Sequence, residues 1–391
     1  MNSTESIRRS PGDTAADIVK RSKLSIWWCQ RWIRLLRKKE PDSRRRIPVR
    51  LMTRIRLWFS GFFGESHVIY KLEERQPSDY LSDFARFIKT PYINGRYSYF
   101  LNNKLAFYWF MRGNEEGRKV IPKIHALIYR GDIRDLNSGQ RIEWKEALRK
   151  YSDEKKRFVI KPINEGGGKG VMVVSTADDV LRVNELPVEN MDAAMVSKGL
   201  AGRDGIIMEY VSQASYAATI FPCATNTIRV LTMWDYDENE PFMPIAVHRI
   251  GSKDSMPVDN WSNGGLSAIV NTETGELGRA VAYPGTGSLV WFDEHPDTGA
   301  MIKGVHIPNW EKIADKLLEL ARMCPFLPYV GWDIIVTEDG MKILEGNNHS
   351  DVNLIQVHQP MLVDSRVRRF YERFNAGNGF ICPSLIADNK Y

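Results

Sequence analysis

The sequence predicts an α+β fold, because helical and strand-like segments occupy different parts of the chain. Apolar residues recur at helical spacing up to about residue 113, and again in residues 310–323 and from about residue 360 to 374. From about residue 119, short apolar runs separated by turn residues instead indicate mostly antiparallel sheets. Helices and antiparallel sheets that are segregated along one chain are typical of the α+β class.

Each predicted helix depends on a local pattern. After about fifteen polar residues, helical segments continue to about residue 65, with an interruption around the PDSRRRIP stretch. Residues 78–113 also have a helical pattern and end in NNKLAFYWFMRG. Residues 310–323 have Asn309 as the expected N-cap and one apolar face. The residues expected on that face are Ile313, Leu317, Leu318 and Ala321.

Composition excludes several classes of protein. The four cysteines are far apart and form no CxxC pair, which argues against a zinc site or a disulfide framework and suits a reducing cytosol. The chain has no apolar run of about eighteen residues, and its first residues do not resemble a signal peptide. We therefore expect a cytoplasmic protein.

Charge is concentrated at the N-terminus. Residues 1–60 hold sixteen Lys and Arg against five Asp and Glu, so this part carries +11 and the remainder of the +6 chain carries −5. Apolar residues recur there at helical spacing beside arginines, and the stretch LMTRIRLWFSGFFG is both aromatic and basic. The apolar residues are Leu24, Trp28, Trp32, Leu35 and Leu36.

Two interpretations of this basic region remain open. Such helices can lie on an anionic membrane, which would make the protein peripheral at the inner membrane surface through residues 1–60. Alternatively, Trp28 and Trp32 pack onto the body of the protein while the arginines are solvated. No nucleic-acid partner is expected, because no recognition motif accompanies the charge.

A glycine loop lies between two strand-like runs in FVIKPINEGGGKGVMVVS, residues 158–175. In a Walker-type loop, Lys would be followed by Ser or Thr and the loop would open a helix. Here Gly170 follows Lys169, and the β-branched run that comes next predicts a strand. The pattern therefore predicts a flap that can cover phosphates, or an exposed hairpin loop without function.

Paired acids occur in GWDIIVTEDGMKILEGNN, residues 331–348, which predicts a hairpin turning at Glu338-Asp339-Gly340. If the turn is centred on Asp339, Asp333 and Glu345 are directly opposed, with side chains about 5 Å apart. Asn347 then shares their face. Trp332, Ile334, Val336 and Leu344 would form the other, apolar face, whereas Ile335 and Ile343 would continue the acid-bearing one.

Such an acid pair indicates a cation. Like charges placed directly opposite are destabilising unless something positive lies between them. Magnesium commonly takes one or two carboxylates together with substrate phosphate oxygens. The alternative is a solvated face with chance acids, and a register slip of one residue would separate the two carboxylates.

The order of these motifs resembles the ATP-grasp superfamily, and most closely its sugar-transfer-associated, alpha-L-glutamate ligase-related branch. The resemblance covers roughly residues 95–372 and includes IIMEYV, NTIRV and DNWSNGGL between the glycine flap and the acid hairpin. It implies two β-rich lobes with ATP between them. The domains expected are a basic, partly disordered or helical region over 1–65, an ATP-grasp domain over 66–375 and a tail over 376–391. Within that domain we expect a helical lead-in over 66–118, an N-lobe over about 119–212 and a C-lobe over about 213–375.

The resemblance also implies roles for particular residues. Lys104, Lys161 and the flap residues Gly166, Gly167, Gly168 and Lys169 would contact nucleotide phosphates, and Glu209 and Val211 would read the adenine edge. Asp333, Glu345 and Asn347 would bind Mg²⁺ or Mn²⁺. Arg229 would face the reacting phosphate, and Arg249 with His248 would bind an acidic substrate.

Several of these residues also have a purely structural interpretation. Lys104 can be a surface lysine, Arg229 a structural ion-pair partner, and His248 and Arg249 caps of a sheet edge. The loop with Asn260, Gly264 and Gly265 can bind substrate or simply turn the chain. After EGN the sequence NHSDVNLIQ departs from the glycine- or proline-rich turn expected, so relatives do not define the substrate.

The leading hypothesis is an ATP- and Mg²⁺-dependent carboxylate–amine ligase. It would form an amide through an acyl phosphate, on a cell-surface polysaccharide or sugar precursor, and the acid and the amine are unknown. One alternative is a kinase-like phosphotransferase with a hydroxyl acceptor. Another is a nucleotide-binding scaffold for glycosyltransferases, which would not need three metal ligands together.

Overall fold

The computed structural model describes residues 15–151, 157–177, 180–189, 191–285 and 287–378, with side chains described from residue 26 onward. These residues form two compact units. The first unit combines the chain up to Thr90 with the chain from Pro360, and the second comprises Pro91–Gln359. The chain thus divides after residues 90 and 359, whereas the domain boundaries predicted above lie after 65 and 375.

The first unit is helical. Its elements are α1 (Ala15–Arg46), α2 (Leu51–Phe59), α3 (Gly64–Ile69), η1 (Pro77–Asp79), the π-helical η2 (Ala85–Lys89), η6 (Met361–Val363) and α12 (Ser365–Arg373). The interruption expected around residues 41–48 comes later, because α1 passes through Pro41 and ends at Arg46. Among the described residues no helix is long and apolar enough to cross a membrane.

The tryptophans of α1 form the core of this unit. Trp28 and Trp32 are only 6% and 4% exposed and pack with Phe63, Phe84 and Ile88. The Trp32 ring stacks on Phe63 with centroids 5.0 Å apart. These two tryptophans therefore pack onto the protein and do not face a membrane. Leu35 and Leu36 flank the same cluster, and Leu24 lies outside the described side chains.

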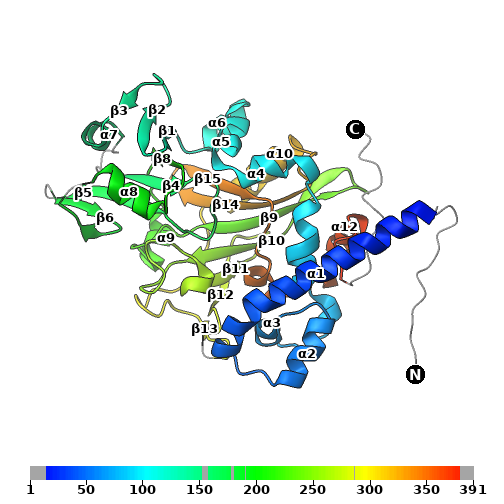
Figure 1. The fold of residues 1–391 in the computed structure, drawn as a ribbon. Coiled ribbons are helices and arrows are strands. Elements are labelled where there is room, and N and C mark those ends of the chain that lie inside the picture. Colours follow the sequence, from blue (N-terminus) through cyan, green and yellow to red (C-terminus); the bar gives the residue numbers. More distant parts are fainter. Residues whose placement is uncertain (1–14, 152–156, 178–179, 190, 286, 379–391) are drawn as a thin grey trace, which may run out of the picture. The chain divides into compact units, whose positions relative to one another are not determined.

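The second unit contains two sheets, and every pairing between named strands in them is antiparallel. The first sheet has the order β3-β2-β1-β8-β4-β5-β6-β7 and the second β13-β12-β11-β10-β9-β14-β15 (Figure 1). The strands of the first sheet are β1 (Ile124–Tyr129), β2 (Asp132–Asp135), β3 (Arg141–Ile142), β4 (Arg157–Pro162), β5 (Met172–Ala177), β6 (Val180–Val183), β7 (Leu186–Pro187) and β8 (Gly205–Glu209). Those of the second are β9 (Ile228–Asp235), β10 (Glu240–Ile250), β11 (Leu266–Val270), β12 (Leu277–Ala282), β13 (Trp291–Phe292), β14 (Tyr329–Thr337) and β15 (Gly340–Asn347).

Helices connect and cover these sheets. They are η3 (Thr90–Tyr92), η4 (Gly95–Tyr97), α4 (Ser98–Asn102), α5 (Lys104–Arg112), α6 (Glu115–Val120), α7 (Trp144–Tyr151), α8 (Ala193–Gly199), α9 (Ser215–Ile220), η5 (Trp261–Asn263), α10 (Trp310–Arg322) and α11 (Asn353–Gln356). α4, α5 and α6 contact β15. The α+β class predicted from the sequence is confirmed.

Helix α10 differs from the sequence prediction in its N-cap and in its buried face. Asn309 does not cap it with its side chain and instead adopts a left-handed conformation with φ 55°. The buried face contains Leu320 rather than Leu318, beside the expected Ile313, Leu317 and Ala321. Since the helix begins at Trp310, whose buried ring packs into the same core, the apolar face is rotated slightly from the expected one.

One apolar core links the two sheets at the place where the candidate site lies. Ile206 and Met208 of β8 belong to the same buried cluster as Val230 of β9 and Trp332 of β14. Phe107 of α5 joins them, with its ring centroid 6.3 Å from that of Trp332. The two sheets and α5 therefore share one core beneath the residues that the motifs identify.

Candidate phosphoryl-transfer site

The glycine flap lies between two strands, as predicted, because β4 ends at Pro162 and β5 begins at Met172. Gly167, Gly168 and Gly170 have φ between 68° and 73°, a conformation that glycine adopts without steric cost. A Cβ on Gly168 would lie 3.0 Å from Val258, so the flap closely approaches the loop after β10. Gly166 and Lys169 are exposed on the flap.

Two lysines line an apolar pocket, and one of them, Lys104, contacts the start of the flap. Lys104, the first residue of α5, and Lys161 of β4 share the pocket with Tyr108, Met208, Leu344 and other apolar residues. The remaining lining residues are Phe107, Ile121, Pro122, Ile124 and Ile206. Lys104 is therefore a pocket residue and not a surface one. Two ammonium groups at the edge of an apolar pocket suit the phosphate oxygens of a ligand.

The environments of the two lysines differ. Burial lowers the pKa of Lys161 to about 8, and the nearby Glu345 partly opposes that shift. Lys104 Nζ lies 3.2 Å from Glu345 Oε2 and also donates to the Glu165 carbonyl on the flap. A buried ammonium near another cation favours an anionic ligand, because the ligand would restore the charge compensation lost on burial.

The predicted hinge lies beside this pocket. Glu209 ends β8 and its N–H donates to the Lys123 carbonyl at 2.9 Å, and Val211 lies in the irregular segment that follows. The lining of the pocket reaches Met208, one residue before Glu209. Contact of Glu209 and Val211 with an adenine edge stays a prediction.

The acid hairpin has the expected pairing for a reason that the sequence did not reveal. Asp333 of β14 is opposite Glu345 of β15, but the two-residue turn at Glu338-Asp339 pairs Thr337 with Gly340. A β-bulge between these sites inserts Leu344 and shifts the register by one residue, so that the acids meet. Without the bulge Asp333 would be opposite Leu344.

The bulge also corrects the predicted faces of the hairpin. Ile343 pairs with Ile334 and lies in the apolar core with Trp332 and Val336, not on the acid-bearing face. Leu344, expected on the apolar face, lines the pocket beside Lys161. The reason is that the extra residue reverses which side chains of β15 point to each face before and after it.

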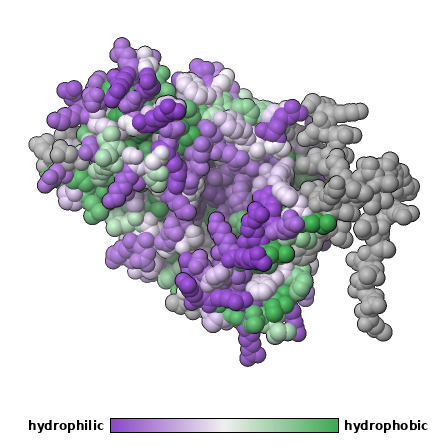
Figure 2. Space-filling view, in the orientation of Figure 1, coloured by the Kyte–Doolittle hydropathy of each residue, from purple (hydrophilic) through white to green (hydrophobic). Residues whose placement is uncertain are grey.

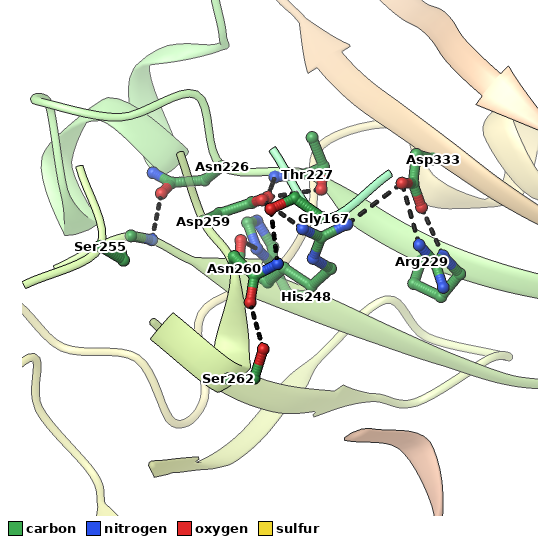
Figure 3. A network of polar contacts seen from close by, with 12 residues as sticks. Gly167, Asn226, Thr227, Arg229, His248, Ser255, Asp259, Asn260, Ser262 and Asp333 are labelled. Carbon is green, nitrogen blue, oxygen red and sulfur yellow. Dashed lines mark hydrogen bonds and ion pairs between the residues drawn. The ribbon is translucent and has the colours of Figure 1, made fainter. Parts of the chain in front are cut away.

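The positive groups beside Asp333 are two arginines. Arg229 of β9 binds both carboxylate oxygens of Asp333, with Nη2 2.9 Å from Oδ2 (Figure 3). Arg249 of β10 donates to the same Oδ2 at 3.1 Å. Burial would raise the pKa of Asp333, but the two guanidinium groups hold that pKa below its usual value. Thus Arg229 makes the structural ion pair that the sequence left open.

A second carboxylate extends this network. Asp259, which the sequence analysis did not identify, accepts a 2.6 Å hydrogen bond from Arg249 Nη2 and a 2.8 Å bond from the Thr227 N–H. Burial raises the pKa of Asp259, although Arg249 and Thr227 oppose the shift. The signal available in the sequence was an acid directly before the NWSNGG loop. Asp259 fixes Arg249 between two carboxylates.

The loop after β10 also touches the flap. Asn260 Nδ2 donates to the Gly167 carbonyl at 2.9 Å, and Asn260 Oδ1 accepts from the Ser262 hydroxyl at 2.7 Å (Figure 3). Gly264 has φ 109°, and a Cβ on Gly265 would lie 2.8 Å from the Asp259 carbonyl oxygen. The glycines therefore serve the turn, whereas Asn260 contacts the flap.

His248 has a structural position. It is fully buried on β10, with Nε2 3.0 Å from the Tyr216 hydroxyl and Nδ1 3.1 Å from the Arg249 carbonyl oxygen. Burial lowers its pKa to about 4, so the ring is neutral near pH 7. His248 supports the backbone of Arg249 and does not itself present a positive charge to an acidic substrate.

The oxygen donors beside the pocket fit a magnesium ion. The Glu345 side chain is 20% exposed, and Asn347 donates from Nδ2 to the Gly331 carbonyl at 3.1 Å, which leaves its Oδ1 as an acceptor. Asp333 Oδ1 accepts one hydrogen bond and retains a lone pair, whereas Oδ2 accepts two. In the described part of the chain, no group of three or more His, Cys, Asp or Glu side chains could hold a metal. Two carboxylates and one amide oxygen would leave coordination positions that the phosphate oxygens of a ligand can fill.

Comparison with known protein families shows to which family the chain belongs. A sequence model described as sugar-transfer associated ATP-grasp matches residues 85–370. The chain belongs to the sugar-transfer associated ATP-grasp family, which confirms the predicted ATP-grasp fold and implies nucleotide binding. No curated protein matches the chain.

Solved structures show distant likeness. N5-carboxyaminoimidazole ribonucleotide synthetase from Thermus thermophilus is 12% identical over 69% of this chain and 52% of that one, with a TM-score of 0.35. D-alanine–D-alanine ligase from Bacillus anthracis is 12% identical over 70% and 68%, with a TM-score of 0.34. L-amino acid ligase from Bacillus licheniformis is 10% identical over 68% and 47%, with a TM-score of 0.32. The chain spans about half the length of the synthetase, and likenesses at these values carry no argument about activity.

Proposed function

We propose that this chain is an ATP- and Mg²⁺-dependent carboxylate–amine ligase. The observation that carries the proposal is the arrangement of four cations, Lys104, Lys161, Arg229 and Arg249, around the opposed acids Asp333 and Glu345. Phosphoryl transfer needs positioning and charge neutralisation more than covalent help. A site with this composition suits a transfer between two anions.

The position of each side chain in the site suggests its role in the reaction. Lys104 and Lys161 bind nucleotide phosphates at the edge of the apolar pocket, and the flap covers them. Glu345, Asn347 and Asp333 would hold the cation, which would supply neutralisation of phosphate charge. Arg229 and Arg249 reach the same place from β9 and β10, so they contact the transferring phosphoryl group and the acceptor carboxylate.

The reaction balances as follows. A carboxylate oxygen of the substrate attacks the γ-phosphorus of ATP, the bond to the β-phosphate oxygen breaks, and ADP leaves. An amine then attacks the carbonyl carbon of the acyl phosphate and gives up a proton, and inorganic phosphate leaves with the C–O bond pair. The products are an amide, ADP and phosphate. The family description favours an acceptor on a cell-surface polysaccharide or sugar precursor.

We propose in addition that the protein acts in the cytoplasm. The described cysteines Cys29, Cys223 and Cys324 are free thiols, which suits a reducing compartment with ATP, and Cys382 lies outside the described residues.

The test is an acceptor screen. The protein is incubated with ATP and Mg²⁺ and with pairs drawn from amino acids and amino sugars, and phosphate release and amide mass are measured. Phosphate release that requires both an acid and an amine, with the amide detected, supports the ligase. ADP formed with a phosphorylated hydroxyl acceptor and no free phosphate would establish the kinase-like alternative. ATP binding without turnover for any pair would favour the scaffold.

A further inference from the structure

Helix α2 of the first unit presents an unusual exposed face. Leu51, Met52 and Phe59 are 56%, 65% and 79% exposed, and Ile55 between them is half-buried. At 100° per residue these four side chains share one side of the helix, whereas Leu57 and Arg54 on the other side are buried. Single exposed apolar residues are ordinary, but a whole helix face is not.

Arginines surround this face. Arg50 directly precedes α2, and Arg56 lies at the edge of the apolar face, both exposed. The Arg44 guanidinium lies 5.4 Å from the ring centroid of Trp58 on α2. Arg45 and Arg46 are also exposed at the end of α1. From residue 43 to residue 64 the sequence contains no Asp or Glu, and the exposed Asp42 directly before this segment is one acid against the five arginines.

A buried ion pair holds α2 in place. Arg54 donates from Nη1 to Glu40 Oε2 and from Nη2 to the Ile47 carbonyl, each at 2.6 Å. The second oxygen of Glu40 accepts from the Gly64 N–H at 2.6 Å. A Cβ on Gly64 would lie 1.9 Å from Arg54 Nη1, so only glycine fits there. The ends of α1, α2 and α3 are therefore fixed together, and the apolar face is presented by a rigid element.

We propose that the face of α2 formed by Leu51, Met52, Ile55 and Phe59, with Arg44, Arg45, Arg46, Arg50 and Arg56, docks on an anionic lipid surface. Helix α2 has nine residues, which suits lying in the plane of the interface rather than spanning it. The apolar side chains enter the boundary between headgroups and acyl chains while the arginines bind lipid phosphates. Figure 2 shows hydrophobic side chains beside hydrophilic ones where Figure 1 draws α2.

Charge favours lipid over a protein partner as the occupant. A protein interface of this size needs acids in matching positions to compensate five arginines, whereas an anionic membrane supplies phosphates at any lateral position. The tryptophans Trp28 and Trp32, although more conspicuous in the sequence, belong to the core and do not take part. The inference is independent of the proposed ligase activity.

The experiment measures co-sedimentation of the full-length protein with two kinds of vesicle. One kind contains phosphatidylcholine only, and the other an equal mixture of phosphatidylcholine and phosphatidylglycerol. Binding is expected to the mixed vesicles alone and to decrease with salt, because exposed charges are screened over about 10 Å at 0.1 M. Deletion of residues 1–60 is not suitable, because it would also remove the core tryptophans.

Two double variants test the electrostatic and the apolar contributions to vesicle binding separately. Arg50→Gln with Arg56→Gln is expected to weaken binding roughly 25-fold, from about fivefold for each arginine. Met52→Ser with Phe59→Ser is expected to weaken it about tenfold or more at every salt concentration. These four side chains are exposed, so the thermal melting curve should stay unchanged.

Matched controls lie elsewhere on the chain. Val363→Ser changes an exposed apolar residue of the same unit, and Arg118→Gln with Arg149→Gln removes two exposed charges from the other unit. None of the controls should alter vesicle binding. No binding to mixed vesicles at low salt would overturn the proposal, as would binding that the α2 variants leave intact. If those variants instead changed only the elution volume of the protein, the face would be an interface between copies.

Discussion

Neutralising each of the two opposed acids should have the same effect on activity and different effects on stability. We consider Asp333→Asn and Glu345→Gln, which keep side-chain size and remove one charge. Both should abolish acceptor-dependent phosphate release, since each removes a carboxylate from the proposed cation site. The partners of the two acids in the structure determine how stability responds.

The magnitudes follow from burial and partners. Asp333 is buried between Arg229 and Arg249, so its neutralisation leaves the two guanidinium groups with only Asp259 and Glu345 as nearby acids and costs about 3–5 kcal/mol. Glu345 pairs with Lys104, both partly exposed, and Lys104 keeps the Glu165 carbonyl as an acceptor. Because these side chains are only 13% and 20% exposed, loss of that pair should cost about 1–2 kcal/mol, more than an exposed surface pair would. The expected decrease in melting temperature is therefore roughly 6–20 °C for Asp333→Asn and about 2–8 °C for Glu345→Gln.

Thermal unfolding without nucleotide and phosphate release with it provide the two measurements. Asp339→Asn is the control, because Asp339 is an exposed acid at the turn of the same hairpin and should change neither quantity. If Glu345→Gln lost as much stability as Asp333→Asn, the acids would form one structural cluster. An Asp333→Asn protein with unchanged melting temperature would show that the arginines do not depend on it.

The site makes three further predictions. Because burial places the pKa of Lys161 near 8, below its ordinary 10.5, unfolding takes up a proton between these pH values and wild-type stability rises with pH there. Lys161→Met should therefore have a free energy of unfolding up to about 3 kcal/mol higher than wild type at pH 7, measured in urea, because no buried ammonium remains. The variant should also lose ATP binding. Equal stability would show that burial of the charged lysine costs no free energy. ATP at a hundred times its dissociation constant should stabilise the protein by about 2.7 kcal/mol in a melting assay with Mg²⁺ and not with EDTA, and equal stabilisation without metal would contradict the acid site. Asn260→Ala should raise the KM for ATP about fivefold, because the Gly167 carbonyl on the flap loses its hydrogen-bond donor. Asn263→Ala in the same loop is the control and should leave the KM unchanged. Equal KM values for the two variants would show that the Asn260 hydrogen bond is not the cause.

Local sequence was sufficient for the fold class and for the strand–loop–strand form of the flap. The glycine spacing, the β-branched run after Gly170 and the turn chemistry at Glu338-Asp339 each act within a few residues. These signals held here because they act on backbone conformation directly, whereas the cap expected at Asn309 and the helix break expected at Pro41 did not form. The order of the motifs then identified the family before any geometry was available.

Only the tertiary structure decided the contents of the site. The acids oppose each other through a bulge at Leu344 that the turn alone does not produce, since a two-residue turn would have separated them by one position. Trp28 and Trp32 have the same helical spacing whether they face lipid or a core, and Phe63 and Phe84 determine which. The cations and acids at Asp333 come from four different strands and a loop, so their pairing depends on long-range packing that no local pattern encodes.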